Sequence, residues 1–266
     1  MTFFSTLAPL QRRVVLPAFI VLALMLLPVL VVVAIAFGSS ATYQFPPQGF
    51  SLRWIRAFLG SEPFMSALFG VSLPLGLASA LVSTLLGTCA AIAIARSAAP
   101  VRTVLQSVFL LPVIFPQIIL GVGLFLLYAR LNFTPSLFSL GLAHVIIATP
   151  YVIRVVLSAI GLLDPRLEEA AQSLGAGPVH AFFLVTLPIL KSSILSGAIF
   201  AFIISFSDVN LALFLSSADT TTLPIQILAQ MQYSSDPTIA AASAAQIGLI
   251  CVLILGVQRL IGVVRG

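Results

Sequence analysis

Charged side chains are scarce in this sequence. Only 7% of its 266 residues are Asp, Glu, Lys or Arg, whereas 60% are hydrophobic. A soluble domain usually carries about a quarter charged residues, so the chain has too little polar surface to face water. It has seven acidic residues, two histidines and a single lysine, Lys191, and these are scattered along the chain. The scarcity excludes an ordinary soluble domain and argues against an enzyme.

Cysteine is also rare, and its placement predicts neither a metal site nor a cofactor. Cys89 and Cys251 both lie in apolar runs, without His or Cys neighbours at the spacing that zinc requires. Basic residues outnumber acidic ones, 12 to 7. Because they are spread over the whole chain and form no patch, they do not predict binding to nucleic acid.

Long apolar runs are abundant, and they indicate that the lipid bilayer is the solvent. A membrane span needs about 20 apolar residues. We predict an all-α integral membrane protein, a single domain over residues 1–266, with six transmembrane helices. The predicted spans are residues 14–37, 66–95, 103–128, 138–160, 193–217 and 240–263. Prolines such as Pro112 and Pro116 lie within them, which is ordinary in membrane helices.

The basic residues predict the orientation of these spans. One set of connecting segments contains Arg12, Arg13, Arg96, Arg102, Arg166, Lys191, Arg259 and Arg265, whereas the other contains Arg53, Arg56 and Arg130. Cytoplasmic loops carry an excess of Lys and Arg, so both termini are expected in the cytoplasm. The outer loop 38–65 is rich in aromatic residues. These fit either the membrane interface or a contact with an extracytoplasmic partner.

The most polar cytoplasmic stretch is residues 161–192, which we expect to carry a coupling function. Asp164 is a good helix N-cap and Pro165 suits the first helical position. Gly175 is the residue expected just past the end of a helix. The pattern predicts a short helix over residues 165–174.

This short helix is amphipathic. Four residues fall on one apolar stripe, namely Leu167, Ala170, Ala171 and Leu174. The chain restarts at Gly177-Pro178 into a second amphipathic piece, which we expect to end at Leu187-Pro188. The amphipathic pattern of the two pieces fits either helices that lie on the membrane surface or an element on which a partner docks.

The spacing within this loop resembles a known motif. Glu169-Ala170-Ala171, three residues, Gly175, nine residues, Val185, one residue and Leu187-Pro188 are similar to the EAA loop of ABC importer permeases. The departure is Val185, where the family usually has Ile. The resemblance implies the type I importer (MetI-like) permease fold in the bacterial inner (cell) membrane. It also implies a coupling helix that contacts an ATPase through Glu168, Glu169, Ala170, Ala171, Gly175 and Ala176.

The resemblance also implies partners. These are separate ABC ATPase subunits that bind ATP and Mg, a second permease subunit that makes a heterodimer, an extracytoplasmic substrate-binding protein and membrane lipid. A P-loop needs the pattern G-x-x-x-x-G-K-[ST]. Lys191, the only lysine, follows Pro188-Ile189-Leu190 and has no glycine loop before it. The chain therefore has no site of its own for ATP hydrolysis.

Asp208 is the acidic residue that lies deep in a predicted span. An acid at the centre of a membrane helix costs about 2.5–3.5 kcal/mol on insertion scales, so it is expected to face a cavity or a partner. One interpretation places Asp208 in the substrate path, together with Ser207 and Asn210. The other is a structural pair with Arg154 or His144.

The stretch around Asp208 indicates the substrate class by resemblance. The run SFSD, followed after a gap by Thr221-Thr222-Leu223-Pro224, is similar to the spermidine/putrescine (PotC-type) permeases, which usually show S-F-D-D. Ser207 replaces the first of those two acids. The resemblance implies a polyamine or a related small amine-bearing solute. Alternatives are aminoethylphosphonate, iron, thiamine or amino-acid-like solutes, and a stand-alone secondary transporter or channel, which would show broken helices or an inverted repeat.

Overall fold

The computed structural model describes residues 9–265, and these fold almost entirely into helices. In order they are α1 (Pro9–Ala36), α2 (Arg53–Leu59), α3 (Glu62–Met65), η1 (Ser66–Ser72), α4 (Leu73–Arg96), α5 (Ala99–Ile114), α6 (Gln117–Arg130), α7 (Leu137–Gly161), α8 (Arg166–Ser173), α9 (Pro178–Ala181), η2 (Phe182–Thr186), α10 (Leu187–Phe206), α11 (Asn210–Leu215), η3 (Ala218–Thr220), α12 (Leu223–Tyr233) and α13 (Thr238–Arg265). The elements η1 and η2 are π-helices and η3 is a 3-10 turn. The all-helical prediction is confirmed.

Five of the described helical stretches are long and apolar enough to cross a membrane. They are Val15–Ala36, Glu62–Arg96, Leu137–Gly161, Pro178–Phe206 and Thr238–Arg259. The helices α5 and α6 make a sixth span if the bent pair is counted as one. The structure thus supports the predicted number of spans but alters two of them.

The predicted span 103–128 is not one continuous helix. It breaks between α5 and α6, whose axes differ in direction by 97°. The cause is Pro116, which cannot donate a backbone hydrogen bond and which disfavours helical geometry in the residue before it. Accordingly Phe115 is extended, with φ −74° and ψ 140°. Pro112 lies inside α5 without ending that helix.

The predicted span 193–217 is also displaced. The helical stretch runs over Pro178–Phe206, and the chain leaves helical geometry at residues 207–209 before α11 begins. The second piece of the cytoplasmic loop therefore does not end at Leu187-Pro188. Pro188 lies in the first turn of α10, where its missing N–H is tolerated, directly after the wider turn of η2.

The described chain forms two compact units, and the described part of the first comprises residues 9–64 and 229–249. Its outer loop is ordered by side-chain hydrogen bonds to main-chain carbonyls. Trp54 Nε1 donates to the carbonyl of Ser40 at 3.1 Å, and the Tyr43 hydroxyl donates to that of Asp236 at 2.9 Å. Burial raises the pKa of Tyr43, and the charge of Asp236 raises it further. Tyr43 is therefore protonated, and able to donate, at neutral pH.

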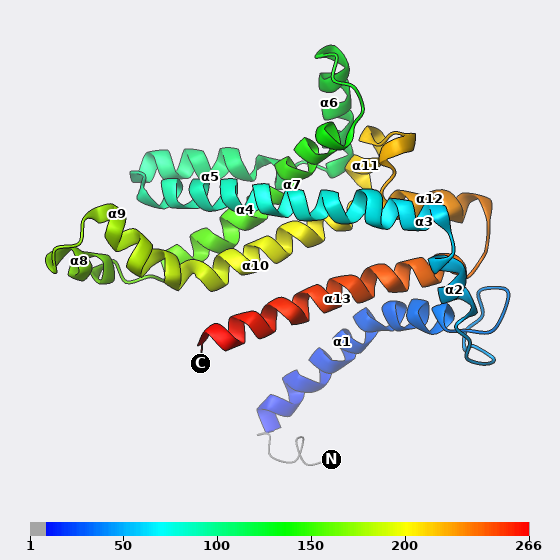
Figure 1. Ribbon diagram of the computed structural model, residues 1–266. Helices are drawn as coiled ribbons and strands as arrows, with labels where there is room; N and C mark the ends of the chain where they lie inside the picture. The colour runs from blue at the N-terminus through cyan, green and yellow to red at the C-terminus, as the bar shows by residue number, and fades with distance from the viewer. Residues whose placement is uncertain (1–8, 266) are drawn as a thin grey trace. The chain divides into compact units, whose positions relative to one another are not determined.

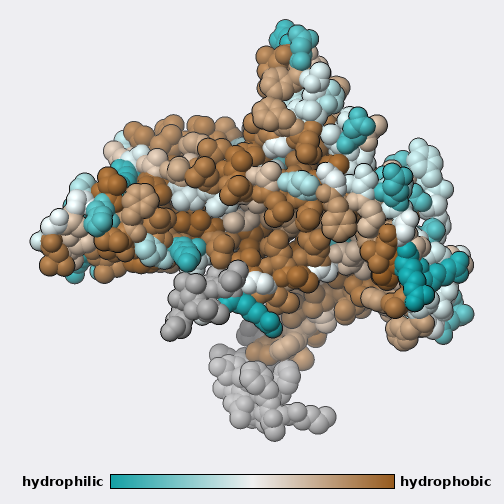
Figure 2. All heavy atoms as spheres, in the orientation of Figure 1, coloured by the Kyte–Doolittle hydropathy of each residue, from teal (hydrophilic) through white to brown (hydrophobic). Residues whose placement is uncertain are grey.

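The second unit comprises Met65–Leu228 and Ile250–Gly266 and contains most of the helical bundle. Within it α4, α7 and α10 pack against one another, α8 and α9 lie at one end, and α6 and α11 lie at the other (Figure 1). Figure 2 shows apolar surface over α4 and α5, and hydrophilic residues interspersed with apolar ones near α8 and α9. This distribution suits a bundle that faces lipid along its sides and water at its end.

Glycines allow the three central helices to approach closely. A Cβ atom on Gly87 of α4 would lie 2.7 Å from the Cβ of Val152 on α7. On the α10 side, a Cβ on Gly197 would lie 3.2 Å from a methyl group of Val152. Small residues at helix interfaces permit this close packing in membrane proteins. Val152 therefore occupies a space that exists because both neighbours lack a side chain.

We predict that Gly87→Ala lowers the free energy of unfolding by about 1–3 kcal/mol, because the new methyl group must displace Val152 or separate the helices. Thermal unfolding of the detergent-solubilised protein measures the change. The matched control is Gly123→Ala in α6, where a Cβ would meet nothing within 4 Å. Equal unfolding temperatures for the two variants would contradict the prediction.

Candidate functional site

The short helix expected in the cytoplasmic loop is present as α8. Asp164 precedes it, and its carboxylate accepts a hydrogen bond from the backbone N–H of Arg166 at 3.0 Å. The N–H groups of the first turn have no partner within the helix, so this contact satisfies one of them. Glu168 and Glu169 follow in the same turn, where the helix dipole favours negative charge.

The end of α8 is fixed by Gly175, which has a φ angle of +96°. The N–H of Gly175 donates to the carbonyl of Gln172 at 3.0 Å, and that of Ala176 donates to Ala171 at 3.1 Å. These two bonds form a Schellman motif, in which the residue after the helix adopts left-handed geometry. Glycine is suited to this position because it has no Cβ.

The residues predicted to contact an ATPase point in different directions. Glu169, Ala170 and Gly175 are exposed, whereas Ala171 and Ala176 are half-buried. Leu174, at the end of the apolar stripe, has 90% of its surface exposed. All eight residues of α8 are at least partly exposed. The helix and the residue after it thus present two leucines, Leu167 and Leu174, to the outside of the bundle.

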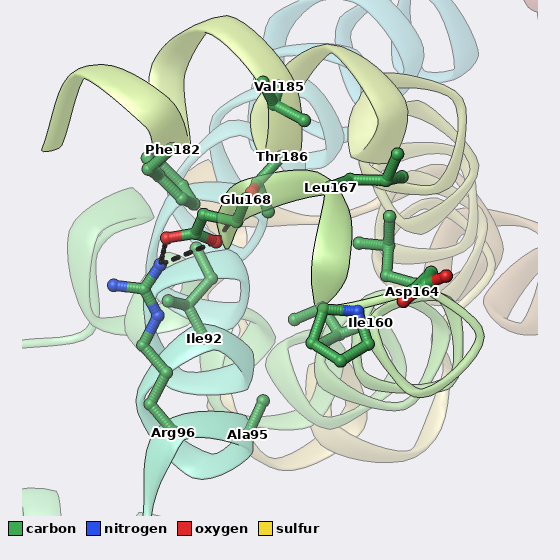
Figure 3. A pocket seen from close by; sticks show the side chains of 12 residues that line it. Ile92, Ala95, Arg96, Ile160, Asp164, Leu167, Glu168, Phe182, Val185 and Thr186 are labelled. Carbon is green, nitrogen blue, oxygen red and sulfur yellow. Dashed lines mark hydrogen bonds and ion pairs between the residues drawn. The ribbon is translucent and has the colours of Figure 1, made fainter. Parts of the chain in front are cut away.

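Glu168 instead points into the protein. Its carboxylate accepts a hydrogen bond from Nη2 of Arg96, with N–O distances of 3.1 and 3.5 Å to its two oxygens. One of these oxygens also accepts a hydrogen bond from the hydroxyl of Thr186 at 2.9 Å. Figure 3 shows the three side chains meeting beside Phe182. Neither Arg96 nor Thr186 was predicted to belong to this site. Arg96 was considered only for the orientation of the spans, and Thr186 carried no motif of its own.

Asp208 lies at the break between α10 and α11 and is only 6% exposed. Its Oδ2 accepts hydrogen bonds from the backbone N–H groups of Leu211 and Ala212, both at 3.0 Å. The same oxygen lies 3.9 Å from Nε2 of His144. The carboxylate thus caps α11 beside the histidine, a geometry that favours the structural interpretation.

His144 is fully buried and connects two helices of the bundle. Its Nδ1 lies 2.8 Å from the hydroxyl of Ser205 on α10. The hydrogen bond to a neighbouring helix that suits a buried histidine is therefore present. Nε2 of His144 and Oδ1 of Asp208 have no hydrogen-bond partner among the described residues.

The two other candidates for the substrate path are also bonded within the protein. The side-chain amide of Asn210 donates to Oε1 of Gln117 at 2.9 Å, which ties α11 to the start of α6. The hydroxyl of Ser207 donates to the carbonyl of Ile203, although the residue itself is exposed. Gln117 was not singled out from the sequence, although a polar residue directly after Pro116 is a signal that could have identified it.

A helical bundle with apolar sides, two broken helices and a capped helix at one end is the architecture of a polytopic membrane transport subunit. The chain belongs to the family of binding-protein-dependent transport system inner membrane components, whose model matches residues 84–262. It is therefore a multi-pass, inner-membrane permease of an ABC importer, as predicted. Helix breaks, which are common in secondary transporters, also occur in this family member.

Two curated relatives and one solved structure illustrate the relationship. The chain is 33% identical to the putrescine transport system permease protein PotI of Escherichia coli (strain K12), over 84% of this chain and 81% of that protein. It is 27% identical to the spermidine/putrescine transport system permease protein PotC of Haemophilus influenzae, over 89% and 91% of the two chains. A bacterial alginate ABC transporter, crystallised with a periplasmic protein bound to an alginate pentasaccharide, has a TM-score of 0.71 at 18% identity, covering 94% of this chain and 93% of the other.

We predict that Asp208→Asn retains most of the stability of the protein, whereas Asp208→Ala loses about 0.5–2 kcal/mol. The asparagine side chain keeps an oxygen that can cap α11, and alanine has none. Thermal unfolding in detergent measures both variants. If Asp208 instead contacts substrate and does not cap α11, Asp208→Ala unfolds like wild type, and Asp208→Asn severely loses uptake of a cationic solute.

Proposed function

We propose that this permease passes a polyamine, or a related small amine-bearing solute, across the inner membrane. Two relatives, PotI and PotC, are described as putrescine and spermidine/putrescine permeases, and each matches most of the chain. Their similarity is the observation that carries the substrate class. The alternatives, which include aminoethylphosphonate, iron, thiamine and amino-acid-like solutes, are outcomes of the uptake experiment below.

We further propose that a separate ABC ATPase supplies the energy and docks on α8. The sequence contains no P-loop, since its one lysine, Lys191, has no glycine loop before it. An exposed helix followed by the exposed Leu174, with Ala170 and Gly175 small enough for a partner to approach the backbone, supports docking. A second permease and an extracytoplasmic binding protein complete the proposed importer, and ATP-driven closure of the ATPases displaces α8.

The alternative for α8 is a helix that lies on the membrane surface. Such a helix buries its apolar face in lipid and keeps its charges toward water. Here one acid of the helix, Glu168, is directed at the bundle, whereas the second, Glu169, and the apolar Leu174 are both exposed. This mixture of polar and apolar exposed groups favours a protein partner over lipid.

We predict that Gly175→Ala weakens retention of the cognate ATPase by about tenfold. A Cβ meets nothing within 4 Å, so the cost is the left-handed backbone, about 1–2 kcal/mol. The matched control is Gly177→Ala, two residues away, where φ is −66° and a Cβ also meets nothing. Co-purification of the co-expressed ATPase at increasing salt measures retention. If wild type retains no ATPase, or if both variants behave alike, docking through α8 is refuted.

We predict that liposomes containing the chain, its second permease and its ATPase accumulate radiolabelled putrescine only with ATP and the cognate binding protein. Unlabelled spermidine is expected to compete, and unlabelled thiamine is the control competitor. Uptake without ATP would indicate a channel or secondary transporter. If the complete complex hydrolyses ATP in response to its binding protein but accumulates no polyamine, the substrate assignment is wrong and the ATP-coupled importer stands.

A further inference from the structure

The carboxylate of Glu168 links its own helix, α8, to two other elements, α4 and η2. Glu168 belongs to α8, Arg96 is the last residue of α4, and Thr186 is the last residue of η2, directly before α10 begins. One side chain therefore bonds to the last residue of α4 and to the residue directly before α10 (Figure 3). We name these three residues the brace.

The three residues of the brace lie in the wall of a cavity. A cavity of about 180 Å³ lies between α8 and the end of α4, with Ile92 and Ala95 on the α4 side and Leu167 on the α8 side. The chain itself connects α8 to α7 before it and to α9 after it. No such connection exists to α4, since Arg96 and Glu168 are 72 residues apart. The ion pair is thus a direct link between α8 and α4 at the cavity wall.

The exposure of the brace indicates that its main task is not stability. The side chain of Arg96 is 56% exposed and that of Glu168 is 27% exposed. Ion pairs near the surface contribute little to folding. The position of the Arg96 side chain is nevertheless well defined, because its guanidinium also lies over the ring of Phe182, 5.4 Å from the ring centroid. Contact with an aromatic face and a carboxylate together restricts where Arg96 can lie.

We propose that the brace transmits displacement of α8 to the ends of α4 and α10, and that Glu168 and Arg96 are positioning residues for transport. This inference rests on the proposed docking of an ATPase on α8. It assigns different tasks to adjacent acids, with Glu169 facing the ATPase and Glu168 facing the membrane helices. Coupling between sites needs an element whose contacts reach both, and the brace is such an element.

The test uses the complete importer in liposomes, with its second permease, its ATPase and its binding protein. Three quantities are measured, namely retention of the ATPase, ATP hydrolysis stimulated by the loaded binding protein, and putrescine accumulated per ATP hydrolysed. In Glu168→Gln we expect unchanged retention and unfolding temperature, and a fall of about tenfold in putrescine per ATP, within the usual range of coupling between sites. The control is Lys191→Gln, which removes an exposed cation from α10 and leaves the brace intact.

Two further variants separate coupling from a structural role. The double variant Arg96→Glu with Glu168→Arg reverses the ion pair and is expected to restore at least about half of the putrescine moved per ATP. Thr186→Val removes one hydrogen bond with little change of shape, so it tests the brace even if a charge variant fails to fold. We expect it to lower the putrescine moved per ATP by about threefold.

Several outcomes overturn the inference. An unchanged ratio in Glu168→Gln or in Thr186→Val does so, as does failure of the folded double variant to recover. Loss of the ATPase from Glu168→Gln also overturns it, because Glu168 would then be a docking contact. A wild-type complex that holds no ATPase refutes the proposed docking instead. If the wild-type complex hydrolyses ATP but moves no putrescine, the ratio of putrescine to ATP cannot be used. The quantity compared is then ATP hydrolysis stimulated by the binding protein, and we expect Glu168→Gln to lose this stimulation.

Discussion

The close contact of Val152 with two glycines governs how the bundle is arranged. Val152 is fully buried on α7, and it packs where Gly87 of α4 and Gly197 of α10 leave room for it. Without this contact α4 and α10 would be held further from α7. Their ends would then diverge, and the carboxylate of Glu168 would not reach both Arg96 and Thr186. Helix packing inside the bundle thereby sets the geometry of the polar contacts at its end.

The two helix breaks are stabilised by polar contacts as well as by close packing. A break in a membrane helix exposes backbone groups that lipid cannot satisfy, which costs several kcal/mol for each group. At the α10–α11 break, Asp208 supplies an acceptor for two N–H groups. At the α5–α6 break, Gln117 accepts from Asn210, so the two breaks are joined. Gly121 lets α6 lie close to α11, since a Cβ there would be 3.0 Å from the ring of Phe214.

Local signals in the sequence predicted local structure well. Gly175 predicted the end of α8, and Asp164 predicted its start to within one residue of the N-cap, Pro165, because caps depend on a few neighbouring residues. The break at Pro116 was not predictable from proline alone, since Pro112 lies within α5 without breaking it. The partners of Glu168 were not predictable either. They lie 72 and 18 residues away, and only the packing of the helices brings them together.

The few acids of the chain show how a nearly uncharged protein uses its polar groups. Three of the seven acidic residues lie in the cytoplasmic loop, and each has a different environment. Asp164 is bound to the backbone at the start of α8, Glu168 to two membrane helices, and Glu169 is left exposed. A helix that must move as a unit needs a fixed end, a link to what it moves and a free face for what moves it. On the proposed function, Asp164 provides the fixed end, Glu168 provides the link and Glu169 lies on the free face.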